Sequence, residues 1–214
     1  MLSGGMKAVG RRERSKAALV AKLLPAVESL LAEGLSYTDL SVEVIIERAG
    51  APRSTFYYHF RDKGELLIAI SADAIGEITE SSKNLYLDDA HSARATFAEA
   101  IRHTAAAWLS HMHLMNAVAE LAAYNPAVKD QYQAAWQLAR GYLAEHISEG
   151  QRSGAVRKDI NPEHTAAWLT WMAERGLGLH AWTAPPDQRD AAIDALATTV
   201  WHTLYPDNHE EKLT

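Results

Sequence analysis

Residues 41–63 read SVEVIIERAGAPRSTFYYHFRDK, and this stretch decides the fold. Ser41 is a suitable N-cap for a short helix over 42–49, because its hydroxyl can accept a hydrogen bond from a free backbone N–H there. Gly50 follows where that helix would end. Pro52 suits the first position of a second helix over 53–60, since the N–H that it lacks would be unpaired anyway. Two short helices joined by a tight turn predict a helix-turn-helix.

The second of these helices has two different faces. Phe56 and Phe60 are four residues apart, so they share a face that can pack into a core. The other positions carry donors and aromatic rings that can reach bases and phosphates in a DNA major groove. These candidate DNA-binding residues are Arg53, Ser54, Thr55, Tyr57, Tyr58 and His59. The competing interpretation is an ordinary solvated helix.

The chain before this motif is first basic and then helical. Residues 1–16 hold five Lys and Arg against one Glu, and we expect them to form a flexible basic arm. Apolar positions at helical spacing predict a helix over 19–32, with Gly34 as its stop. Pro25 lies within that helix and predicts a kink or a restart, because it removes one backbone donor.

The chain after the motif shows only helical periodicity. Residues 62–65 have the spacing of a capping box, and the helix that they open runs to about Leu85. Five more helices are predicted at about 93–111, 114–124, a long segment after Asn125-Pro126, 163–182 and 187–205. The predicted fold class is all-α with about nine helices. A helix-turn-helix domain over 17–64 is joined through the fourth helix to a helical C-terminal domain over 65–214.

Charge is divided unevenly along the chain. The net charge is −6, but residues 1–64 carry 10 Lys and Arg against 7 Asp and Glu, whereas residues 65–214 carry 11 against 20. The basic segment 1–64 can still bind a polyanion, while the acidic segment 65–214 repels phosphate and so orients the approach. The net charge therefore does not exclude nucleic acid as a partner.

Missing residue types exclude several classes of function. The chain has no Cys, which excludes disulfides, thiolate nucleophiles and cysteine-ligated zinc. It has no P-loop, nucleophile elbow, GxGxxG or HExxH motif. His111 and His113 are two residues apart, about 200° around a helix, so both could ligate one metal ion only if the helix breaks there, and no carboxylate is adjacent to them. We expect no enzyme, no cofactor and no metal, in a cytoplasmic protein without a membrane span or signal peptide.

The stretch from Ile45 to Leu67 resembles the signature of TetR-family transcriptional regulators, because the turn, the aromatic pair and the Asp62-Lys63 pair all occur in register. The resemblance covers about residues 23–70. It implies a homodimer whose third helix enters the major groove of double-stranded operator DNA and whose C-terminal helices bind a small effector. It further implies base contacts by Arg53 and Thr55 and phosphate contacts by Ser54, Tyr57, His59 and Lys63.

Two positions depart from the family pattern. Pro52 stands where the family commonly has a Ser that caps the third helix, so one donor is missing. Ile46 replaces a small Ala in the second helix. We expect Ile46 to alter packing against the first helix more than the choice of DNA.

The C-terminal half is more weakly similar to one branch of this family, the mycobacterial-type repressors that control ethionamide activation. The similarity rests on residues 172–175, on residues 200–205 and on several aromatic residues. In that branch the matching region forms a long apolar tunnel. The lining residues implied here are Phe97, Trp108, Trp136, Thr170, Glu174 and Trp201. Ala173 stands where the branch has an amide, so one polar anchor for a ligand is missing.

All six Trp lie beyond residue 100, where large aromatic side chains can line an apolar pocket. For Trp108 and Trp136 two roles are equally expected, namely lining a ligand pocket and packing in the core. The last two predicted helices carry more apolar residues than one core stripe needs, which predicts a four-helix dimer interface. The residues concerned are Trp168, Leu169, Met172, Leu177, Leu179, Ile193, Leu196, Val200 and Leu204.

Together these features predict a ligand-responsive, homodimeric DNA-binding regulator. We expect a repressor that a small apolar effector releases from its operator, although the residues themselves do not distinguish a repressor from an activator. The alternative is a helical small-molecule-binding protein or enzyme whose basic front has no DNA role. Binding to duplex DNA at two salt concentrations distinguishes these classes, because phosphate contacts give a steep salt dependence.

Overall fold

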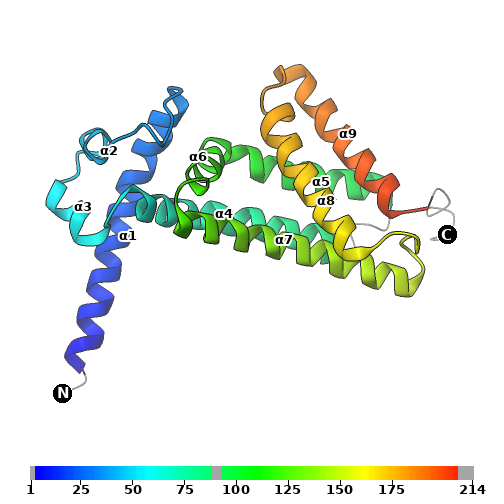
Figure 1. Cartoon of the computed structure of the whole chain (residues 1–214), viewed down its shortest axis with the longest axis horizontal. Coiled ribbons are helices and arrows are strands. Elements are labelled where there is room, and N and C mark those ends of the chain that lie inside the picture. The colour runs from blue at the N-terminus through cyan, green and yellow to red at the C-terminus, as the bar shows by residue number, and fades with distance from the viewer. Residues whose placement is uncertain (1–2, 88–92, 207–214) are drawn as a thin grey trace. The chain divides into compact units, whose positions relative to one another are not determined.

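The computed structural model describes residues 3–87 and 93–206, which form helices joined by turns and short connections. Within this range the chain divides into two compact units. The first comprises residues up to 74 together with 113–132, and the second comprises residues 75–112 and those from 133 onward. Helices α4 (Lys63–Leu87) and α7 (Pro126–Ser153) contribute to both units (Figure 1). The described residues contain no strand, and the all-α fold is confirmed.

The first unit contains the predicted helix-turn-helix. Its elements are α1 (Ser3–Ala32), α2 (Val42–Ala49), α3 (Arg53–His59), the first half of α4 and nearly all of α6 (Met112–Ala122). Apolar side chains at helical spacing build its core. They include Leu23, Val27, Leu30, Ile45, Phe56, Phe60, Leu66, Leu67 and Ile70. Phe56 of α3 and Phe60 are both fully buried there, although the helix ends at His59 and Phe60 is its extended C-cap.

Glycines end α1 and α2 in the same way. Gly34 and Gly50 have φ of +86° and +58°, a left-handed conformation that is cheap only without a Cβ. At the second of these ends, Ala51 N donates to Ile46 O at 2.8 Å, which completes a Schellman motif. The chain therefore turns sharply, and α3 begins after only three connecting residues.

Helix α1 differs from its prediction at two points. It begins at Ser3, so residues 3–16 are helical where a flexible arm was expected. Residues 11–16 include three Arg, one Glu and one Lys, which are good helix formers, and the helix continues N-terminally through three Gly that disfavour it. Pro25 lies inside α1, and the helix does not restart there. Pro25 is on an exposed side of the helix, where the carbonyl that it leaves without a donor can bind water.

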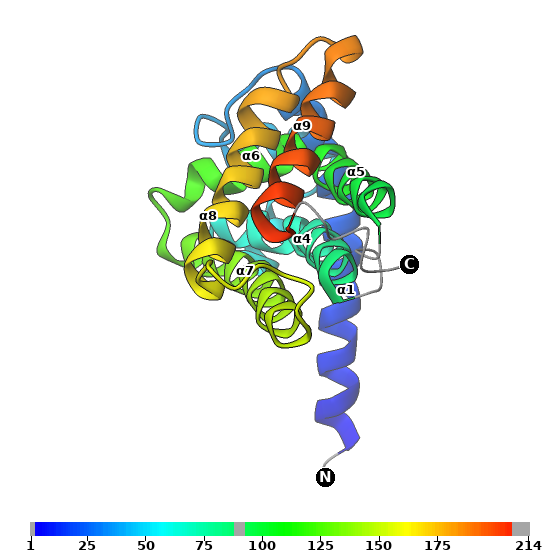
Figure 2. The ribbon, with the colours of Figure 1, turned by 90° about the vertical axis from the view of Figure 1, so that its right-hand side faces the viewer.

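The second unit consists of the rest of α4 and α7 with α5 (Arg94–Ser110), α8 (Pro162–Arg175), the π-helix η2 (Gly176–Ala181) and α9 (Pro186–Leu204). Helix α9 lies between α8 and α5 and packs closely on α5 (Figure 2). Its core includes Phe97, Ile101, Leu143, Ile147, Val200 and Leu204. The helix predicted over 163–182 changes at Gly176 from α-helical to π-helical turns, a feature that short-range periodicity does not reveal.

Candidate functional site

The turn between α2 and α3 is held by backbone caps. Ser41 Oγ accepts a hydrogen bond from Val44 N at 3.2 Å, as its N-cap position predicts. Pro52 is the N-cap of α3, one position earlier than predicted, and provides no side-chain cap. Its carbonyl accepts from Thr55 N and Phe56 N at 3.0 and 3.2 Å instead. Helix α3 is thus held by backbone hydrogen bonds, by the buried ring of Phe56 and by the buried ring of its C-cap residue Phe60.

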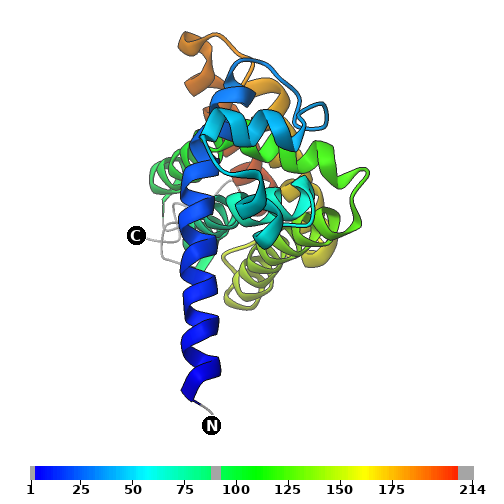
Figure 3. The same ribbon diagram turned by 90° about the vertical axis from the view of Figure 1, so that its left-hand side faces the viewer.

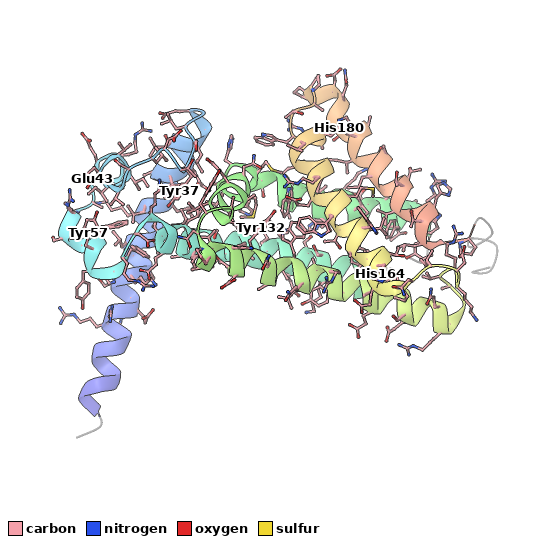
Figure 4. All side chains as sticks on the ribbon, viewed as in Figure 1. Tyr37, Glu43, Tyr57, Tyr132, His164 and His180 are labelled. Atoms are coloured by element: carbon pink, nitrogen blue, oxygen red, sulfur yellow. The ribbon has the colours of Figure 1, made fainter. Side chains whose placement is uncertain are left out.

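The outer face of α3 is polar and accessible. The side chains of Arg53, Ser54, Tyr57 and Tyr58 are exposed, and Thr55 is half-buried. Figure 4 shows Tyr57 at the outer side of α3, whereas Tyr37 lies inside the unit. A row of donors on a short helix braced by a second helix has the arrangement of a recognition helix that enters a DNA major groove.

Arg53 already has partners within the unit. Its Nη1 lies 2.7 Å from Glu43 Oε1 on α2, and its guanidinium lies over the Tyr57 ring at 5.3 Å. Both members of the ion pair are exposed, and exposed pairs contribute only about 0–1 kcal/mol. Exchange of this carboxylate for a base edge or a phosphate therefore costs little.

His59 is buried, which corrects its prediction as an accessible phosphate contact. Its Nε2 lies 3.1 Å from Ser15 Oγ on α1, so the helical form of residues 3–16 covers it. Burial, followed by the nearby charges of Arg12 and Lys16, lowers the pKa of His59 below its ordinary value of 6.5. The ring therefore stays neutral at pH 7 and supports the junction between α1 and α3.

Lys63 is also engaged within the unit. Its Nζ donates to the carbonyl oxygens of Tyr37 at 3.1 Å, of Leu40 at 2.9 Å and of Thr38. Tyr37 Oη donates in return to Lys63 O at 2.7 Å. An ammonium group has three donors, and all three are used. The predicted phosphate contact by Lys63 is therefore not supported, because the side chain instead clasps residues 37–40 to the start of α4.

The carboxylate of Glu120, which no sequence pattern indicates, also holds the loop between α1 and α2. Glu120 on α6 accepts hydrogen bonds from the hydroxyls of Ser36 and Thr38. These residues are more than 80 positions apart in the chain, so no local pattern indicates the contact. The loop between α1 and α2 is thus fixed by Lys63 and Glu120 together.

The predicted ligand-lining residues fall into two aromatic clusters of the second unit. Trp108, Trp136 and Trp171 form a row from α5 through α7 to α8, with ring centroids 5.3 and 6.0 Å apart. Phe97 and Trp201, 5.6 Å apart, pack instead with Tyr205. All three members of that second cluster are buried, which is typical of a packed core.

The tryptophan row runs from the interior to the surface. Trp108 is buried, Trp136 is half-buried and Trp171 is exposed. Trp108 Nε1 has no hydrogen-bond partner among the described residues, and a buried donor without a partner is uncommon. Thr170 beside Trp171 is half-buried, while Glu174 is buried with its Oε2 3.4 Å from Arg175 Nε.

The predicted dimer residues do not form one surface. Leu169, Leu177, Ile193, Val200 and Leu204 are buried within the chain itself, and Leu196 is half-buried. Their prediction as interface residues is wrong because the core of the second unit takes up more of α8, η2 and α9 than one narrow stripe. The exposed apolar side chains of α8 and η2 are Trp168, Trp171, Met172 and Leu179.

Neither a metal site nor a membrane span is found in the described part of the chain. His111 Nε2 lies 2.9 Å from Glu77 Oε2, and no group of three potential metal ligands occurs within 3–87 and 93–206. In the same residues no helix combines the length and apolar content needed to cross a bilayer.

Two family models match the chain. Residues 28–70 match the bacterial regulatory proteins of the tetR family, and residues 97–206, just over half of the chain, match the C-terminal domain of the transcriptional regulator EthR. The chain therefore belongs to the TetR family of DNA-binding transcriptional regulators. Within that family its C-terminal domain is of the EthR type.

Several solved structures share the fold at low sequence identity. SmeT, the repressor of a Stenotrophomonas maltophilia multidrug efflux pump, is 20% identical, with a TM-score of 0.65 over 91% of this chain and 94% of SmeT. A regulator from Saccharomonospora viridis in complex with choline is 19% identical, with a TM-score of 0.68 over 89% of this chain and 99% of its own. At these identities the likeness shows the fold alone. No curated protein matches the chain.

Proposed function

We propose that this regulator is a homodimeric repressor that leaves its operator when a small apolar molecule binds its second unit. The observation that carries the DNA-binding part is the outer face of α3. Four exposed polar and aromatic side chains lie on a helix that is anchored by the buried Phe56 and, directly after its last residue, by the buried Phe60. That anchoring holds the donors in one orientation, which groove recognition requires.

Arg53 and Thr55 are proposed to read base edges, because they lie in the first turn of α3 and the first turn of a recognition helix contacts bases. Ser54, Tyr57 and Tyr58 are proposed to bind phosphates. His59 and Lys63 position α3 without touching DNA, since the His59 ring is buried with its Nε2 on Ser15 Oγ, and the Lys63 ammonium group donates to loop carbonyls of the first unit.

A dimer is proposed to form through α8, η2 and α9. Trp168 is 77% exposed and Leu179 is 66% exposed, and a Trp side chain can bury about 150–250 Å². Covering most of Trp168 would contribute about 3–4 kcal/mol per protomer at about 25 cal/mol per Å². To read two half-sites on one face of a duplex, the two α3 helices of this dimer must lie about 34 Å apart, or a multiple of that distance.

The effector is proposed to bind beside the row Trp108, Trp136 and Trp171. Trp136 lies between the rings of Trp108 and Trp171 and is half-buried, so part of its surface is accessible to a ligand. The N–H of Trp108 has no partner within residues 3–87 and 93–206 and can donate one hydrogen bond to an otherwise apolar ligand. Structures of the same fold hold triclosan in SmeT and choline in the Saccharomonospora viridis protein, which supports a small organic ligand here.

Release is proposed to act through α4, which begins at Lys63 beside α3 and continues into the second unit. A ligand shifts DNA affinity only by the difference in its own affinity for the two states. A coupling free energy of about 1–3 kcal/mol would weaken operator binding about 5- to 150-fold.

Duplex binding at two salt concentrations tests the proposed function. The wild-type chain should bind a fluorescent 30-base-pair duplex much more weakly at about 200 mM than at about 50 mM KCl, because phosphate contacts release counterions. A chain that binds no duplex at either concentration is instead a small-molecule-binding protein or an enzyme of the same fold.

A further inference from the structure

The N-terminal part of α1 carries a cationic surface that the proposed contacts of α3 leave unused. In residues 10–18, Arg11, Arg12 and Arg14 are exposed and Lys16 is half-buried. None of these four forms an ion pair within the described residues. Other arginines of the first unit do form ion pairs: Arg48 with Glu33, Arg53 with Glu43, and Arg61 with Glu65. The charge of residues 10–18 is therefore opposed within the segment only by Glu13.

This segment is fastened to the end of α3. The guanidinium of Arg12 lies over the Tyr58 ring at 5.6 Å, and Lys16 Nζ lies over the Phe60 ring at 5.3 Å. The hydrogen bond between Ser15 and His59 lies between these contacts. Figure 3 shows α1 running past α2 and α3 and continuing beyond them. The cationic segment is thus a continuation of the surface that α3 presents.

We propose that residues 10–18 of α1 form a second DNA-contacting surface, on which Arg11, Arg12 and Arg14 neutralise phosphates beyond those that α3 reaches. Nine helical residues span about 13 Å, which equals the rise of about four base pairs. The inference rests on the proposed DNA binding by α3 and extends it along the duplex backbone.

The composition of the segment favours DNA over a membrane. A helix that lies on a bilayer needs a large apolar face beside its cationic one. Residues 10–18 read GRRERSKAA and contain no large apolar side chain. Phosphate contacts need only positive charge and a fixed position, and the contacts with Tyr58, Phe60 and His59 supply the position.

The test compares two double variants of the full chain on the duplex that the wild type enriches from a random pool. In Arg11→Gln/Arg14→Gln, two exposed charges of the segment are removed. In Arg140→Gln/Lys158→Gln, two exposed charges of the second unit are removed as a matched control. We expect the slope of log affinity against log KCl to become shallower by about 0.9 for each lost contact, or about two per protomer. The control should keep the wild-type slope, and both variants should keep the wild-type melting temperature and the same enriched sequence.

A wild-type slope in the Arg11→Gln/Arg14→Gln variant overturns the inference and leaves the proposed function standing. The inference is also overturned if that variant keeps the slope but loses binding to poly-glutamate, since the surface then serves an acidic protein. A wild-type chain that enriches no duplex overturns the proposed function and the inference together. The single variant Arg14→Gln should lose about half as much of the slope, and a larger loss with a lowered melting temperature contradicts the phosphate role.

Discussion

Replacing Lys63 by Met separates a phosphate contact from an internal clasp. The substitution keeps an unbranched side chain but removes the ammonium group that donates to three carbonyls of the loop between α1 and α2. A buried acceptor left without its donor costs about 1–3 kcal/mol. Tyr37 and Leu40 are buried, while Lys63 itself is half-buried, so water can replace part of the loss. We expect a loss of about 2–3 kcal/mol, because two of the three carbonyls should stay unsatisfied and, with water nearby, each costs only about 1–1.5 kcal/mol, the low end of that range.

Two measurements on Lys63→Met check this account. Thermal unfolding should show a melting temperature lower by about 4–12 °C, at about 2–4 °C per kcal/mol for a chain of this size. At a temperature where the variant is folded, the salt dependence of duplex binding should match that of the wild type. Lys158→Met serves as the control, because Lys158 is exposed and donates no hydrogen bond within the described residues.

The opposite pair of results would contradict the role of Lys63 as an internal clasp of the loop between α1 and α2. If Lys63→Met leaves the melting temperature unchanged and reduces the salt slope by about one, the ammonium group binds a phosphate, as the family resemblance implies. The three carbonyl contacts would then be unimportant for the loop.

Three further predictions concern base reading, the effector and the dimer. Arg53→Ala should relax the preference at one or two base pairs by about 1–3 kcal/mol in a panel of single-base-pair variants, and an unchanged preference removes Arg53 as a base reader. For the effector, the compound that most raises the melting temperature of the wild type is first selected from an apolar library. Trp136→Ala should weaken the binding of that compound at least about tenfold, or 1.4 kcal/mol, and should leave ligand-free DNA binding intact. If stability and DNA binding fall together, Trp136 is a core residue. Trp168→Asp/Leu179→Asp should sediment as a monomer at micromolar concentration, whereas the control Leu138→Asp, on α7, should remain a dimer. If both variants remain dimers, the dimer interface lies elsewhere on the chain.

Local patterns predict the helix-turn-helix well because its determinants are close in sequence. Ser41 and Gly50 cap α2 through bonds spanning three to five residues, and Phe56 in α3 and Phe60 directly after it are four residues apart and both buried. Each of these features follows from spacing and backbone conformation alone.

Contacts between distant segments explain what the sequence did not reveal. His59 was predicted to be accessible because nothing local indicates that Ser15, 44 residues earlier, covers it. Lys63 has the charge of a phosphate ligand, but its partners are carbonyls that only the folded loop brings together. Apolar content alone also assigned too many residues to the dimer interface, since five of the nine residues concerned are buried in their own chain. Charge and hydropathy thus indicate what a residue can do, while tertiary contacts decide whether it is free to do it.

Enrichment of duplexes from a random-sequence pool by the wild-type chain shows directly whether this chain recognises a DNA sequence through α3. We expect one enriched sequence with twofold symmetry, whose half-site centres lie about 10–10.5 base pairs apart or a multiple of that spacing. A pool that stays random after repeated rounds, with duplex affinity that is insensitive to salt, would contradict DNA recognition by this chain.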